Sequence, residues 1–189
     1  MKSTLHEYRH VLIIGAIMFA SAGLLLYLGR NPWCECGTIK LWHGDNFSAE
    51  NSQHISDWYS FSHVVHGLLS YGLLSLIAGR QSIGRRAIAA TLVEEAWEIL
   101  ENTDAMIERY RETTISLGYV GDSVINSVGD VSFMLTGFWL ASRLPAKATV
   151  GLAVGLELLA GVAIRDNLTL NLIMLIHPLE AIRTWQLGA

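Results

Sequence analysis

The stretch from residue 11 to 28 reads VLIIGAIMFASAGLLLYL and contains no charged residue, although Arg9 and Arg30 lie close on either side. An apolar helix of this length matches a hydrocarbon core of about 30 Å. A cleaved secretory signal peptide is the alternative interpretation, because Ala20-Ser21-Ala22 resembles a cleavage site. Cleavage there would split the apolar run, so the pattern favours an uncleaved membrane anchor.

Composition agrees with this interpretation. Of the 189 residues, 51% are hydrophobic, and the mean hydropathy of +0.36 is high for a soluble domain. A net charge of −4 without a basic tract argues against nucleic acid and leaves membrane lipids as the expected partners. No repeat or linker divides the chain. We therefore predict an all-α fold, a polytopic membrane bundle of five or six transmembrane helices, forming one domain over residues 1–189.

The remaining predicted spans differ in clarity. The runs 61–79 and 120–142 are apolar and are closed by Arg80 and Arg143. The run 148–164 contains Glu157, and the run 168–187 is interrupted by His177-Pro178, where proline would kink a helix. The last two runs are therefore the weaker candidates, and the number of spans between residues 148 and 187 stays open.

Residues 87–100 form an unusual helix, because Glu94, Glu98 and Glu101 follow one face of it. A central carboxylate costs about 2.5–3.5 kcal/mol on insertion scales, whereas each Leu or Ile returns only about 0.3–0.6 kcal/mol. This helix can span only if its acidic face turns toward other helices or a wet cavity. Otherwise it lies at the interface as an amphipathic helix.

The distribution of basic residues favours a cytoplasmic N-terminus. Residues 31–60 and 101–118 then become the outer, periplasmic loops. Eight of the thirteen Lys and Arg fall on the inner side, namely Lys2, Arg9, Arg80, Arg85, Arg86, Arg143, Lys147 and Arg183.

With this topology, the polar residues of three helices lie at the same depth, in the outer half of the membrane. His63 and His66 are three residues apart, while Glu94 and Glu98 are four apart, so each pair shares a helix face. A third stripe with a spacing of four contains Asp122, Asn126 and Asp130. We predict one pocket that joins these imidazoles and carboxylates, because buried ionisable groups in a membrane usually serve a function.

Imidazoles and carboxylates in a helical bundle suit Zn, Mn or Fe. The predicted metal ligands are His63, His66, Glu98, Asp122 and Asp130, and the predicted catalytic groups are Glu94 and Asp122. Simpler interpretations stay open: interhelical hydrogen bonding for the histidines and Asp130, a solvated face for the glutamates, and helix capping for Asp122.

The segment 121–130, GDSVINSVGD, preceded by Glu94 and Glu98 and by the His63/His66 pair, resembles an uncharacterised family of small bacterial inner-membrane proteins. The resemblance covers nearly the whole chain, including WCECG (33–37) and NSQHISDWYSFSH (51–63). It implies a location in the bacterial inner (plasma) membrane and gives no established reaction.

More distantly, the order of these residues is similar to that of the VanZ-like membrane proteins, a group tied to glycopeptide-antibiotic tolerance. That resemblance implies Asp122, Asn126 and Gly129 as binding residues, with Glu94 or Glu98 as the upstream acid. Asp57 is the further binding candidate, but it precedes His63 by six residues, whereas the VanZ-like proteins have Asp and His close together.

Three functions fit these residues, so whether the protein is an enzyme stays open. The first is a metal-dependent hydrolase or transferase acting on a lipid or lipid-linked envelope precursor. The second is a protein that binds or transports protons, cations or a lipid headgroup without chemistry, along a path from Asp130 to Glu157. The third is an assembly subunit of a membrane complex, or a homo-oligomer, with the acidic segment 101–112 as its contact surface.

The outer loop also contains Cys34 and Cys36. A disulfide between them would close a very small ring, so we expect two unbonded cysteines; a disulfide, intermolecular pairing or a metal contact are the alternatives. His43 and His54 are expected to be exposed loop residues.

Overall fold

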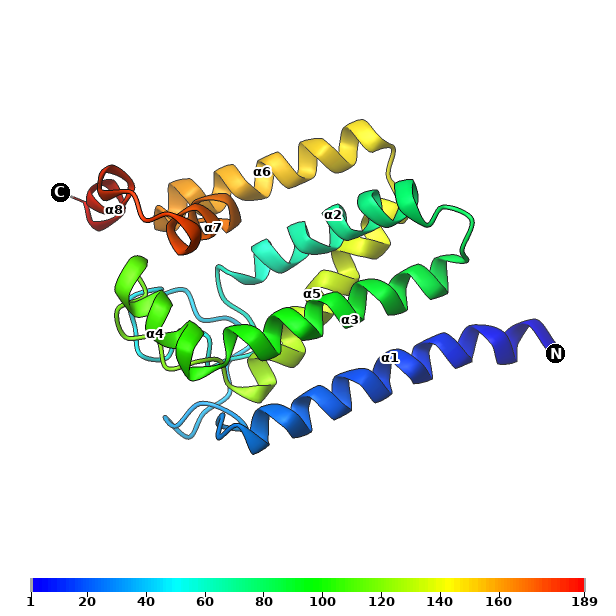
Figure 1. Ribbon diagram of the computed structural model, residues 1–189, viewed down its shortest axis with the longest axis horizontal. Coiled ribbons are helices and arrows are strands. Elements are labelled where there is room, and N and C mark those ends of the chain that lie inside the picture. The colour runs from blue at the N-terminus through cyan, green and yellow to red at the C-terminus, as the bar shows by residue number, and fades with distance from the viewer. Residues whose placement is uncertain (1, 189) are drawn as a thin grey trace.

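The computed structural model describes residues 2–188, with side chains from Tyr8 onward, and this part of the chain is helical with no strand. The all-α prediction is confirmed (Figure 1). The helices are α1 (Lys2–Tyr27), α2 (Ser60–Ile77), α3 (Ile83–Glu101), α4 (Asp104–Thr113), α5 (Val124–Arg143), α6 (Ala146–Ile164), α7 (Leu168–Ile176) and α8 (Glu180–Leu187).

Five long helices, α1, α2, α3, α5 and α6, form the bundle (Figure 1). Four segments are long and apolar enough to cross a membrane: Tyr8–Tyr27, Ser60–Ile77, Val124–Arg143 and Ala146–Ile164. The remaining long helix, α3, is long enough to cross a membrane, but it carries too many charged residues to be identified as a span from its composition. It packs against α1, α2 and α5 with Glu94, Glu95 and Glu98 buried. The acidic face therefore turns inward, as spanning requires.

The predicted sixth span, 168–187, is wrong. The chain breaks at His177-Pro178 into α7 and α8, and the nine residues of α7 reach only about 14 Å, half the thickness of the hydrocarbon core. Both short helices lie at the end of the bundle that holds α4 (Figure 1). There the Arg109 guanidinium donates two hydrogen bonds, of 3.0 and 2.7 Å, to the carbonyl of Leu175.

This placement also corrects the predicted side of Arg183. Because the chain breaks at His177-Pro178, α8 lies at the same end as α4 and the irregular segment 28–59, opposite the N-terminus (Figure 1). Arg183 therefore joins the basic residues of the loop end, and the excess at the N-terminal end is smaller than the sequence indicated.

Helices α2 and α5 approach each other most closely, because glycines lie at their crossing. A Cβ on Gly67 would overlap the carbonyl oxygen of Met134, and a Cβ on Gly137 would overlap that of Val64. Small residues at such crossings let two backbones meet in a membrane. Beside this crossing, a cluster of Ala90, Val131, Met134 and Phe138 closes the middle of the bundle with apolar side chains.

At the loop end, segments that are far apart in the sequence are tied together. Arg30 donates hydrogen bonds to the Val120 carbonyl and to Asp104, both at 3.0 Å. Cys34 and Cys36 form a disulfide, contrary to our expectation of unbonded cysteines. A tight turn brings them together, in which the Gly37 N–H donates to the Cys34 carbonyl and Gly37 has a φ of 76°.

The close packing at the α2–α5 crossing can be tested with two glycine-to-alanine variants. Gly137→Ala should destabilise the protein by about 1–3 kcal/mol, because the added methyl group must displace backbone. Gly72→Ala is the control, since nothing lies within 4 Å of a Cβ built there. Thermal unfolding in detergent should show a lower midpoint for Gly137→Ala alone. Equal midpoints for the two variants would contradict this packing.

Candidate functional site

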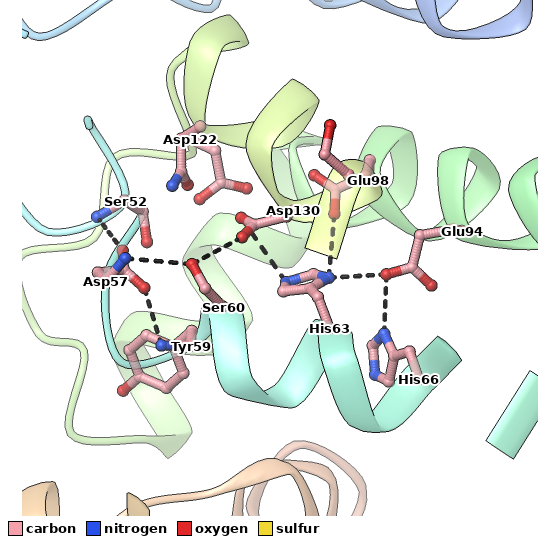
Figure 2. Close-up of polar contacts among 12 residues, drawn as sticks. Ser52, Asp57, Tyr59, Ser60, His63, His66, Glu94, Glu98, Asp122 and Asp130 are labelled. Atoms are coloured by element: carbon pink, nitrogen blue, oxygen red, sulfur yellow. Dashed lines mark hydrogen bonds and ion pairs between the residues drawn. The ribbon is translucent and has the colours of Figure 1, made fainter. Parts of the chain in front are cut away.

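Three helix ends meet where the loops cover the bundle. The first turns of α2 supply His63 and His66, the last turns of α3 supply Glu94 and Glu98, and α5 supplies Asp130 (Figure 2). The structure therefore brings five of the predicted site residues into one cluster, with His63 at its centre.

Glu94 lies between the two imidazoles. The Nδ1 atoms of His63 and His66 lie 2.7 and 3.0 Å from the same Oε1 of Glu94, at hydrogen-bond distance (Figure 2). An ionised carboxylate only accepts hydrogen bonds, so each imidazole donates its Nδ1–H to Glu94 and turns Nε2 away from it. This contact fixes the orientation of both rings and makes Glu94, only 3% exposed, tolerable inside the bundle.

Glu98 has no such partner. Its exposure is 0%, and neither carboxylate oxygen makes a hydrogen bond. The Nδ1 of His63 lies 3.5 Å from its Oε1. A buried carboxylate without a donor is costly, and such a group calls for a bound proton, water or metal ion.

Asp130 lies on the other side of the His63 ring. Its Oδ2 is 3.7 Å from His63 Nε2, and its Oδ1 accepts a hydrogen bond from the Ser60 hydroxyl at 3.2 Å. The Ser60 Oγ in turn accepts the backbone N–H of Asp57 at 3.1 Å. Asp57 is thus linked to the Asp130 carboxylate through the Ser60 hydroxyl.

Asp57 has a local structural role. Its carboxylate accepts the backbone N–H groups of Ser52 (3.0 Å) and Tyr59 (2.8 Å), which shapes the chain as it enters α2. Burial raises the pKa of this carboxyl, against the lowering effect of those two hydrogen bonds.

Asp122 lines the same cavity as His63, but other residues occupy its oxygens. It accepts hydrogen bonds from the Asn102 amide (2.8 Å) and the Tyr119 hydroxyl (3.0 Å). Burial raises the pKa of Asp122 to about 6 in spite of these donors. The residue does not cap α5, as one interpretation proposed; the neighbouring Ser123 does, by accepting the N–H of Asn126.

The other two predicted binding residues, Asn126 and Gly129, hold the irregular segment 28–59 against α5. The Asn126 amide donates to the His54 carbonyl at 2.8 Å, and a Cβ on Gly129 would overlap the Ile55 carbonyl oxygen. Within the described residues, neither one lines the cavity beside His63. Their placement therefore favours packing of the loop over contact with a ligand.

The cavity has a volume of about 50 Å³, enough for a few water molecules. Polar groups of His63, His66, Asp122 and Asp130 form one part of its wall. The rest of the wall comes from α2, α3, α4, α7 and the loops. Most of its side chains are aromatic, apolar or carry a hydroxyl group, and one of them, Glu101, is acidic. The residues are Asn51, Ser52, Tyr59, Ser62, Trp97, Glu101, Tyr110, Ser116, Tyr119, Leu168, Asn171 and Leu172. Within the described chain, no Lys or Arg lines it.

Sequence reasoning missed several of these residues. Asn102 continues the spacing of Glu94 and Glu98 by four more residues, and this signal was available in the sequence. Tyr110 and Tyr119, whose ring centroids are 5.2 Å apart, carry no comparable pattern, because they come from α4 and the loop that follows it.

A further buried carboxylate, that of Asp166, joins the C-terminal helices to the site. It accepts hydrogen bonds from the Tyr59 hydroxyl (3.0 Å), the Gln186 amide (3.0 Å) and the Asn171 amide (3.4 Å). Burial outweighs these donors and raises the pKa of Asp166 to about 6. This contact places α7 beside the cavity.

Comparison with known proteins identifies the family. Residues 25–188 match the model of a protein of unknown function, DUF2585. The chain belongs to this family. It is 56% identical over 170 residues to a UPF0314 protein of Paracoccus denitrificans, covering 90% of this chain and 88% of the relative. A UPF0314 protein of Brucella anthropi is 52% identical over 177 residues, covering 94% and 90%. No solved structure matches.

The family membership confirms the predicted resemblance to an uncharacterised bacterial family. The more distant likeness to VanZ-like proteins stays a prediction, as do the roles of the site residues.

Asp166 predicts a pH dependence of stability. Because its pKa is higher in the folded protein than the ordinary value of 3.8, the folded state binds the proton more tightly, and stability is lost as pH rises from about 4 to about 6. Replacing Asp166 with Asn should remove about 1–3 kcal/mol of this pH dependence. Urea or thermal unfolding of the wild type and of Asp166→Asn from pH 4 to 7 measures this difference. If the stability of the two proteins changes with pH in the same way, Asp166 is not the source of the pH dependence.

Proposed function

We propose that this protein is a metal-dependent hydrolase or transferase of the bacterial inner membrane, acting on a lipid or lipid-linked envelope precursor. One observation carries the proposal: Glu98 is completely buried, and neither of its oxygens has a hydrogen-bond donor. A divalent cation between Glu98, His63 and Asp130 would satisfy this carboxylate.

The donor atoms fit such an ion. One atom each of His63, Glu98 and Asp130 lies within 4.8 Å of the other two, and the same holds for His63, His66 and Glu94. We favour the first group, because both imidazoles already satisfy Glu94 whereas nothing satisfies Glu98. Imidazole with carboxylates is a ligand set for Zn, Mn or Fe.

A bound metal supplies Lewis acidity, which polarises a substrate carbonyl and acidifies a water molecule. His66 is then the candidate general base: it lines the cavity, and its Nδ1–H is held by Glu94, which leaves Nε2 free to accept a proton. Glu94 acts through His66 as a positioning residue. The oxygens of Asp122 accept hydrogen bonds from Asn102 and Tyr119, so we assign it no catalytic role, in contrast to the prediction from sequence.

The cavity favours an uncharged reacting group. No Lys or Arg in the described chain lines it, so a phosphate would meet the carboxylates of Glu101, Asp122 and Asp130 with only the two imidazoles and the proposed metal ion to offset its charge. Trp97 and Leu172 offer an apolar wall to the rest of the substrate. The substrate class we propose is therefore an acyl ester or amide of a lipid.

Two observations support an outward-facing site, with the N-terminus in the cytoplasm. The disulfide of Cys34 and Cys36 lies at the site end, and disulfides persist mainly in oxidising compartments such as the periplasm. Arg80, Arg85 and Arg86 lie at the opposite end of the bundle, as expected for a cytoplasmic loop.

The alternative is a protein that binds a proton, cation or headgroup without chemistry. It is favoured by the continuous polar chain that runs from His66 through Glu94, His63 and Asp130 to Ser60. Transport across the whole membrane has less support, because the apolar cluster around Met134 closes the bundle beyond Asp130.

The proposed path to Glu157 is also interrupted. The carboxylate of Glu157 accepts the backbone N–H groups of Leu168 and Thr169, at 3.1 and 3.0 Å, and so caps the start of α7. It serves the turn between α6 and α7 rather than a route through the membrane.

The proposal predicts a metal that Glu98 helps to hold. Protein purified in detergent without affinity metal should contain about one equivalent of Zn, Mn or Fe, and Glu98→Gln should lower its affinity for the ion by at least about tenfold. Glu108→Gln, an exposed acid of α4, is the matched control and should keep the metal. Elemental analysis gives the result; a folded wild type without metal, never exposed to a chelator, would contradict the metal site.

A second measurement tests the reaction itself. Wild type in vesicles that contain acyl-ester phospholipids should release fatty acid or transfer the acyl chain, detected by mass spectrometry, and Glu98→Gln should lose this activity. If metal is bound but no ester or amide lipid is consumed, the non-enzymatic alternative replaces the enzyme.

A further inference from the structure

The irregular segment 28–59 contains a second cluster of metal-binding side chains. One donor atom each of Cys34, Cys36, Glu50 and His54 lies within 4.8 Å of the others. His54 is only 1% exposed, which corrects the expectation of an exposed loop histidine. A disulfide does not require an imidazole and a carboxylate beside it. Two sulfurs, one imidazole and one carboxylate are, however, a donor set suited to tetrahedral zinc.

The contacts around the cluster provide a charge balance. The Glu50 carboxylate accepts a hydrogen bond from Lys40 Nζ at 2.5 Å and lies 2.9 Å from His54 Nε2. Zn²⁺ bound by two thiolates and one carboxylate would have a net charge of −1, which the ammonium group of Lys40 neutralises. The donors are thus gathered and partly desolvated before any ion arrives.

We propose that reduction of the Cys34–Cys36 disulfide converts this cluster into a zinc site with Cys34, Cys36, Glu50 and His54 as ligands. A dithiol supplies two electrons and two protons to the sulfur–sulfur bond and itself becomes a disulfide. The two new thiols then lose their protons as they bind Zn²⁺. The imidazole binds as a neutral ligand through Nε2 with its proton moved to Nδ1, so the hydrogen bond that Nδ1 accepts from the Lys40 N–H at 3.3 Å is given up.

This loop is connected to the candidate active site. A cavity of about 420 Å³ adjoins the cysteines, and Asp122 lines both this cavity and the one beside His63. The Gln53 amide donates to the Gly121 carbonyl at 2.7 Å, directly before Asp122. A change at the cysteines would therefore occur beside the segment that carries Asp122.

The experiment compares zinc binding by the oxidised and reduced protein, with the His63 site disabled by Glu98→Gln. The protein in detergent is treated with dithiothreitol, freed of it under argon, and titrated with Zn²⁺. The reduced form should bind about one equivalent more than the oxidised form. With Co²⁺ in place of zinc, a thiolate-to-cobalt charge-transfer band should appear.

Variants separate the site from general effects of reduction. Cys36→Ser and His54→Ala should each weaken the reduction-dependent binding by at least about tenfold, while Glu35→Gln, the exposed residue between the cysteines, should not. Cys36 is itself exposed, so its replacement should leave the fold intact, which thermal unfolding can verify. Equal zinc binding before and after reduction, or full binding by Cys36→Ser, would overturn the proposal.

Discussion

Glu94 accepts hydrogen bonds from two imidazoles, and this contact lets an acidic helix lie inside an apolar bundle. Without His63 and His66, the carboxylates of α3 would face hydrocarbon at a cost that its few Leu and Ile residues cannot offset. With them, α3 packs between α1 and α5. The loops, α4 and α7 then close over the polar end, so the site and the fold depend on the same few side chains.

The buried carboxylates of the site differ in whether they have hydrogen-bond donors. Glu94, Asp57 and Asp122 all have hydrogen-bond donors, whereas Glu98 has none in spite of complete burial. Unsatisfied groups of this kind are rare in native proteins and often mark a functional position. The apolar cluster around Met134 lies on the inner side of the polar pocket, and residues of α4, α7 and the loops line it at the loop end.

The sequence predicted the parts of this structure that follow from local spacing. Apolar runs identified four spans, and the spacings of three and four residues placed His63, His66, Glu94, Glu98 and Asp130 on helix faces that meet in the structure, whereas Asn126 of the same stripe contacts the loop. It did not predict contacts that depend on distant loops, such as those of Tyr119 with Asp122 or of Asn126 with His54. The run 168–187 was misjudged because average hydropathy outweighed the break that Pro178 imposes.

The most direct measurement of the central claim is X-ray absorption spectroscopy of the bound metal in a Cys34→Ser/Cys36→Ser variant, which removes the second cluster. The account predicts a first shell of nitrogen and oxygen with imidazole scattering from His63, and loss of that scattering in a further His63→Ala variant. A metal shell without imidazole, or one unchanged by His63→Ala, would contradict it.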